Sequence, residues 1–141
     1  MANINRDYLI VLDVKSSVIS EADGLKYYIT DEHSKNLLVN LVVKETNRIN
    51  KYVEVHDPER YQLELHIVKP NNDIVRPHLQ GNLLSVDDAI FAFDLPKEAT
   101  DRIGTYKCEL RVTYQEADGN TITTSNKFRY RVKRSVYNEL D

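Results

Sequence analysis

The side chains that could bind a metal ion or act as nucleophiles are few and widely spaced in this chain. Its four histidines are His33, His56, His66 and His78. They lack the His-x-x-x-His spacing of a zinc site, and the single cysteine, Cys108, has no Cys-x-x-Cys partner. His66 falls on the polar side of an alternating stretch, where a solvated side chain is expected. These residues therefore predict no metal site.

The carboxylates are no better placed for catalysis. Asp87 and Asp88 adjoin the start of a predicted strand, and Asp94 lies further along it. Adjacent carboxylates in an extended segment point to opposite faces, which suits neither a shared metal nor an acid/base pair. The sequence also lacks a Gly-x-Ser-x-Gly elbow, a glycine-rich phosphate loop and a dinucleotide fingerprint. We expect no catalytic residues, no cofactor and no enzymatic activity.

One charged segment, KFRYRVKR at 127–134, could do chemistry of another kind. Its cations, here called the basic stripe, are Lys127, Arg129, Arg131, Lys133 and Arg134. The first four share one face of a strand, while the apolar residues between them face the other way. Such a stripe can dock an acidic partner or a phosphate backbone, or it can keep an exposed strand soluble and protected from edge pairing. The net charge of −3 argues against nucleic acid, so the stripe is our candidate protein interface.

Alternation of apolar and polar residues dominates the chain and predicts strands instead of helices. In the stretch at 61–69, Leu63, Leu65 and Ile67 point one way and the polar residues between them point the other. The predicted strands span 8–14, 25–29, 37–43, 61–69, 74–79, 91–95, 104–114 and 121–132. The run at 37–43 should be covered on both faces, and Pro77 suggests a sheet edge.

Loops and turns separate these strands. Residues 15–24 and 44–50 read as loops, and KEATDR at 97–102 predicts one short helical turn. Asp118-Gly119 favours a tight hairpin turn with positive φ before the last strand. The inward residues of that strand are predicted to be Ile122, Phe128, Tyr130 and Val132.

Turns at intervals of about ten residues indicate an all-β Greek-key β-sandwich of about seven to nine strands, with a barrel as the alternative. With 141 residues the chain fits a single domain. We assign that domain to residues 1–134. Residues 135–141 would form a C-terminal tail or the start of a continuation.

The segment GTYKCEL at 104–110 makes the predicted sandwich immunoglobulin-like. Tyr106 lies two residues before Cys108, as in an F strand whose tyrosine makes a corner hydrogen bond and whose cysteine bridges the sheets. The chain has one cysteine and no tryptophan, so the disulfide is excluded. We therefore expect apolar burial to hold the sheets together, with Cys108 as a small buried residue.

Nothing in the sequence indicates secretion or a membrane span. The first residues, MANINRDYLIVLDV, lack the three regions of a signal peptide. The longest apolar run, LLVNLVV, is interrupted by Asn40 and is too short to cross a bilayer. We expect a protein that is soluble, is made in the cytoplasm and has no membrane partner.

Three segments together resemble the N-terminal immunoglobulin-like domain of phage baseplate upper proteins. They are DEHSKNLLVNLVVKETN, YQLELHIVKPNNDIV and GTYKCELRVTYQEADGNTITTSNKFRYRVKRSV. The shared features, in order, are an acidic turn before an apolar strand, a strand ending in Lys-Pro, a Gly-x-Tyr strand and a closing strand rich in Thr, Ser and Phe. They fall at 31–43, 61–74, 104–114 and 121–132.

The resemblance implies a non-enzymatic structural adaptor in the tail baseplate of a phage of Gram-positive bacteria. Such a protein is made in the host cytoplasm, joins the baseplate core and links it to host-recognition components. Its partners are other baseplate and tail proteins, and trimers form through regions after this domain. The family has no catalytic signature to transfer to residues of this chain.

Two other functions remain open from the sequence. A carbohydrate-binding sandwich that contacts the host cell surface would need exposed aromatic residues in one loop cluster. The candidates are Tyr27, Tyr28, Tyr52 and Tyr137. An enzyme acting on cell-wall polymer would need a carboxylate pair facing a cleft.

Overall fold

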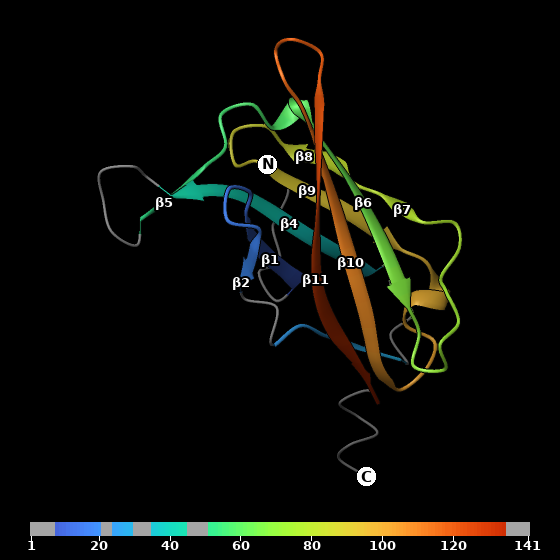
Figure 1. Ribbon diagram of the computed structural model, residues 1–141. Helices are drawn as coiled ribbons and strands as arrows, with labels where there is room; N and C mark the ends of the chain where they lie inside the picture. The colour runs from blue at the N-terminus through green and yellow to red at the C-terminus, as the bar shows by residue number, and fades with distance from the viewer. Residues whose placement is uncertain (1–7, 21–23, 30–34, 45–50, 135–141) are drawn as a thin grey trace.

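The computed structural model describes residues 8–20, 24–29, 35–44 and 51–134. Within these ranges the chain forms eleven strands and two short 3-10 turns, arranged as two sheets packed face to face (Figure 1). The predicted all-β sandwich is therefore confirmed. Three short strands that the sequence pattern did not predict raise the strand number above the expected seven to nine.

The first sheet has the order β2-β1-β4-β9-β8, and β5 also pairs with β4. Its strands are β1 (Leu9–Asp13), β2 (Val18–Ser20), β4 (Lys35–Lys44), β5 (Tyr52–Glu54), β8 (Asn82–Ser85) and β9 (Ile90–Leu95). β1 runs parallel to β4, with Leu9 opposite Leu38, and the other pairs are antiparallel. As predicted, β4 is covered on both faces, because Leu37, Leu38 and Val39 are all buried.

The second sheet has the order β3-β11-β10-β6-β7. Its strands are β3 (Lys26–Tyr28), β6 (Tyr61–Val68), β7 (Leu79–Gln80), β10 (Gly104–Gln115) and β11 (Thr121–Lys133). β10 pairs along its whole length with β11, while β3 runs parallel to β11 over only three residues. Gly119 has a φ of 90°, as expected for the hairpin turn between β10 and β11.

Two segments differ from the predicted layout. The predicted loop at 15–24 contains β2, a three-residue edge strand whose alternation is too short to detect. The return strand predicted at 74–79 is reduced to an isolated bridge between Val68 and Ile74, followed by the two-residue β7. Pro77 precedes β7, which lies at the sheet edge as predicted. Residues 45–50 of the second predicted loop and the tail at 135–141 lie outside the described residues.

Ile122 was wrongly assigned to the core. Ile122 lies on the same face of β11 as the buried Tyr130 and Val132, but it is 50% exposed. The tip of the β10–β11 hairpin projects beyond the first sheet (Figure 1), so inward-facing residues near the tip find no opposite sheet. Alternation predicts the face of a strand but not where the other sheet ends.

The core lies between the sheets and follows the predicted alternation. Leu63, Leu65 and Ile67 of β6 are all at most 1% exposed. On β10, Cys108 is buried between Tyr106 and Leu110, and its thiol is free. Burial raises the pKa of the Cys108 thiol well above its usual range, because a thiolate would be desolvated there. Cys108 is thus the small buried residue that the sequence predicted.

Four tyrosines pack in a row at one end of the sandwich. This tyrosine cluster consists of Tyr8, Tyr27, Tyr130 and Tyr106. Successive ring centroids are 4.9, 5.2 and 5.0 Å apart, in stacked, edge-to-face and stacked arrangements. These separations are typical of favourable aromatic pairs. The row extends from the start of β1 in one sheet across β3, β11 and β10 in the other.

The hydroxyl groups of this cluster tie the second sheet to the rest of the sandwich. Tyr27 donates to the Asn36 carbonyl at 2.8 Å, which joins β3 to β4 of the first sheet. Tyr130 donates to the Ala99 carbonyl at 2.5 Å. The Tyr106 oxygen accepts from the Arg102 N–H at 3.0 Å and lies 3.2 Å from the Arg102 carbonyl, as expected for the corner tyrosine.

The connection between β9 and β10 receives two of these hydroxyls. It contains the 3-10 turn η3 (Lys97–Ala99), which confirms the helical turn predicted near 97–102. The connection ends at Gly104, whose φ is 144° and whose added Cβ would approach the Pro70 side chain to 2.8 Å. Only glycine fits this position easily. A second 3-10 turn, η2 (Pro58–Arg60), was not predicted.

Tyr106→Phe should destabilise the domain by about 0.5–1.5 kcal/mol, because the Arg102 N–H loses its acceptor in a partly buried place. Chemical denaturation followed by circular dichroism measures the change. Tyr52→Phe is the matched control, since Tyr52 is 50% exposed and outside the cluster. Equal stability of the Tyr106→Phe variant and the wild type would show that the corner contact is not made in solution.

The Cys108 thiol should not react with a water-soluble aromatic disulfide reagent while the protein is folded. Its 4% exposure and raised pKa both oppose formation of an accessible thiolate. In denaturant, one thiol per chain should react at once. Rapid labelling of the native protein, measured by absorbance, would mean that Cys108 is not sealed between the sheets.

Candidate functional site

The basic stripe lies on the outer face of the second sheet. Lys127, Arg129 and Arg131 are exposed along β11, and Lys133 is half-buried at its end. Arg134 is exposed directly after the strand. The structure thus brings four of the five predicted residues onto one strand face, as the sequence alternation required.

Two further cations join the stripe from neighbouring strands. Lys107 of β10 lies opposite Arg129, and Lys26 of β3 lies opposite Arg131. Both lysines are exposed. We call the stripe together with Lys26 and Lys107 the basic patch. The sequence predicted only part of the strand pairing that forms this patch. The Asp118-Gly119 turn sets the register of β10 against β11 and so places Lys107 opposite Arg129. No local pattern predicted that β3 pairs with β11.

Like charges directly opposite each other on paired strands are destabilising. Within the part of the chain that the structure describes, no cation of the basic patch makes an ion pair. The repulsion between Lys107 and Arg129, and between Lys26 and Arg131, is therefore not relieved by an ion pair among these residues, although Glu109 lies opposite Lys127 in the β10–β11 ladder. The patch is a concentrated positive field that an anionic partner would neutralise.

The part of the same sheet face next to the patch carries carboxylates, and Glu109 lies directly opposite Lys127 of the patch. Glu109 accepts hydrogen bonds from Ser125 at 2.6 Å and from Arg111 at 3.3 Å, and these contacts lower its pKa. Glu64 accepts from Gln80 at 3.1 Å and contacts His66, which likewise lowers its pKa. His66 is therefore paired with a carboxylate instead of being merely solvated. These two carboxylates contact other partners, so the cations of the patch form no ion pair among the described residues.

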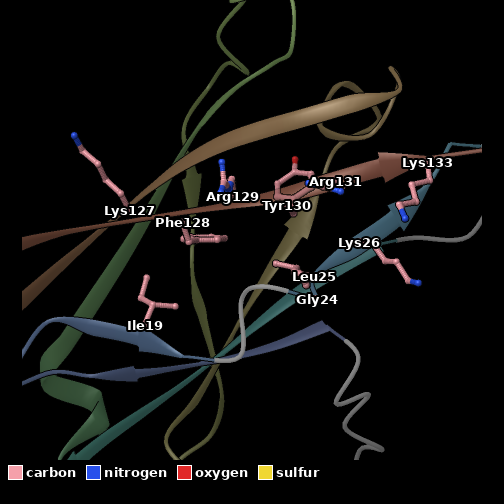
Figure 2. A pocket seen from close by; sticks show the side chains of 10 residues that line it. All are labelled: Ile19, Gly24, Leu25, Lys26, Lys127, Phe128, Arg129, Tyr130, Arg131 and Lys133. Atoms are coloured by element: carbon pink, nitrogen blue, oxygen red, sulfur yellow. The ribbon is translucent and has the colours of Figure 1, made fainter.

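A groove of about 580 Å³ runs along β11 beside the basic patch. Its lining residues come from β2, the start of β3 and the second half of β11: Ile19, Gly24, Leu25, Lys26, Lys127, Phe128, Arg129, Tyr130, Arg131 and Lys133. Figure 2 shows β2 with Ile19 on one side of the groove and β11 on the other, with Lys127 directed away from Ile19. Ile19 and Phe128 are half-buried, so the groove has apolar walls beside a cationic rim.

The structure does not assemble the residues considered for catalysis. Asp87, Asp88 and Asp94 are exposed, and Asp88 is engaged by the Ser85 hydroxyl at 3.2 Å in a turn. His56 is exposed, while His33 lies outside the described residues. Among the residues described, no group of three or more His, Cys, Asp or Glu side chains could hold a metal ion. No described helix has the length and apolar character that a membrane span needs.

The aromatic candidates for sugar binding are also dispersed. Tyr27 is buried in the tyrosine cluster. Tyr28 lies half-buried on β3, whereas the exposed Tyr52 lies on β5 of the other sheet. Tyr137 lies outside the described residues. The candidate tyrosines that the structure describes therefore form no exposed aromatic platform.

Comparisons with known proteins identify the fold. No protein-family model matches the sequence, and no curated protein matches it. Among solved structures, the chain is similar to the N-terminal domain of phage TP901-1 ORF48, with a TM-score of 0.56 and 14% identity. That match covers 90% of this chain and 98% of the other. A second match, CopC from Methylosinus trichosporium OB3b, has a TM-score of 0.41 and 12% identity, covering 79% and 87% of the two chains. The chain thus shares the overall fold of a phage protein's N-terminal domain.

Proposed function

We propose that this domain is a structural component of a phage tail baseplate, docking on the baseplate core and linking it to host-recognition components. The observation that supports this proposal most is the fold, shared with the N-terminal domain of phage TP901-1 ORF48 over nearly the full length of both chains. The order of sequence features at 31–43, 61–74, 104–114 and 121–132 points to the same role. A fold alone hosts many functions, so docking itself must be tested.

In this proposal the domain is an immunoglobulin-like sandwich without the disulfide. Tyr106 makes the corner contact with Arg102, and Cys108 is buried two residues later. A sandwich that needs no disulfide can fold in the reducing cytoplasm of a host bacterium before assembly into the virion tail. Homo-oligomers, as trimers formed outside this domain, complete the proposed assembly.

The proposed role depends on protein contacts and not on catalysis. The carboxylates and histidines considered for catalysis lie in turns and surface pairs where the structure describes them, and the described candidate tyrosines do not gather into a sugar-binding platform. The basic patch is the surface best suited to a partner, because its unrelieved positive charge would be neutralised there. A cationic surface accelerates association with an acidic protein and disfavours basic ones.

The domain should form a stable complex with purified baseplate core proteins from the same phage tail module, detected by size exclusion with light scattering. Because Arg129 and Arg131 are exposed in the patch, reversing both to Glu should weaken the complex roughly tenfold or more. Lys15→Glu is the control, since Lys15 is exposed on the β1–β2 turn and does not line the groove. Failure of the wild type to bind any core protein would contradict the proposal.

A further inference from the structure

An unpaired strand edge lies beside the basic patch. β11 pairs with β10 along Thr121–Val132, but β3 covers its other side only at Arg131–Lys133. β2, across the groove, belongs to the other sheet and is not hydrogen-bonded to β11 as a ladder. The part of β11 before Arg131 therefore presents one open side.

The backbone groups on this side have a definite direction. The Arg131 N–H donates to the Leu25 carbonyl at 3.2 Å, and the Lys133 carbonyl accepts from the Ile29 N–H at 2.9 Å. In an antiparallel ladder, residues alternate between bonding to the partner strand and pointing away from it. Because Arg131 and Lys133 point away from β10, so do Lys127 and Arg129. Their N–H and C=O groups face the groove, and no strand of the described residues pairs with them.

The side chains around this edge alternate in character. Those of Lys127 and Arg129 stand on the outer, cationic face, while Phe128 between them turns toward the interior and is half-buried. Ile19 closes the groove on the opposite side. A strand placed here would therefore carry one row of side chains next to cations and the other row next to Phe128 and Ile19.

We propose that an extended acidic segment of a partner protein adds as a strand to the open edge of β11 at Lys127–Arg129. Its main chain bonds to the N–H and C=O groups of these two residues. Alternate Asp or Glu side chains lie against the basic patch, and the apolar side chains between them pack on Phe128 and Ile19. This mode, β-strand addition, draws affinity from backbone bonds and specificity from alternate side chains. The inference rests on the proposed function, since it names the chemistry of the docking partner.

Charge complementarity selects this occupant over the alternatives. A second copy pairing through the same edge would bring two basic patches together, and like charges across an interface oppose association. A nucleic acid could neutralise the cations, but it could not continue the hydrogen-bond ladder of β11. Edge protection would explain charges on β11 itself. Protection of the edge does not explain why Lys107 lies opposite Arg129 and Lys26 lies opposite Arg131, since repulsion within these pairs weakens the sheet.

The first test uses a synthetic peptide of alternating Glu and Val. Backbone amides of Lys127 and Arg129 should gain hydrogen-exchange protection when it binds, measured by NMR on the wild-type domain. A peptide with Lys in place of Glu, a peptide with Glu and Val in separate blocks, and a single-stranded oligonucleotide of equal charge are the controls. Binding of any control as tight as the alternating peptide, or binding without protection of these two amides, would overturn the proposal.

The second test separates backbone pairing from charge. Arg129→Thr removes the charge but keeps the N–H, whereas Arg129→Pro removes both. Proline is tolerated at an edge position whose N–H faces away from the ladder. The Pro variant should bind the peptide roughly tenfold more weakly than the Thr variant, since it loses a main-chain hydrogen bond. Equal binding by two folded variants would contradict strand addition. If the Pro variant does not fold, the hydrogen-exchange protection of Lys127 and Arg129 in the wild type tests the proposal instead.

The same variants distinguish this inference from the proposed function. If core proteins bind the wild type and the Arg129→Pro variant equally well, docking occurs elsewhere and the strand-addition inference is wrong, while the baseplate role stands. If no core protein binds but the alternating peptide still protects Lys127 and Arg129, the edge is a real site and the baseplate role is contradicted.

Discussion

The closure of one end of the sandwich depends on the tyrosine cluster. Immunoglobulin domains join their sheets with a disulfide, which this chain cannot form. Here Tyr27 bonds to the start of β4 in the opposite sheet, and Tyr106 and Tyr130 bond to the connection between β9 and β10. Each ring supplies a large apolar area while its hydroxyl satisfies a backbone group, so the contact is both hydrophobic and directional.

This closure also determines which part of the second sheet stays open. β3 pairs with the end of β11, where Tyr27 packs on Tyr130 with ring centroids 5.2 Å apart. Among the described residues, no strand pairs with the remaining length of β11 on that side. The short reach of β3 therefore leaves the edge at Lys127–Arg129 available, next to cations that form no ion pair with a described carboxylate. The packing that stabilises the fold and the surface proposed to dock a partner are two consequences of one arrangement.

Local patterns in the sequence were sufficient for the long strands and the core. Alternation predicted β6, β10 and β11, and the Tyr106-x-Cys108 spacing predicted a buried thiol beside a corner tyrosine. Contacts between distant segments were not accessible in this way. Neither the pairing of β3 with β11, which brings Lys26 to the patch, nor the end of the opposite sheet, which exposes Ile122, leaves a local signal. The stripe was predictable, but the patch and the groove depended on topology.

A spectrophotometric titration of the nine tyrosines tests this account most directly. Burial raises the pKa of Tyr27, Tyr106 and Tyr130. Their contribution to stability is thus complete below about pH 10, the ordinary pKa, and is lost as pH rises further. We expect the surface tyrosines to ionise first, and the cluster to ionise only as circular dichroism reports unfolding. Ionisation of all nine tyrosines in one step at about pH 10, with the fold intact, would contradict the burial of the tyrosine cluster.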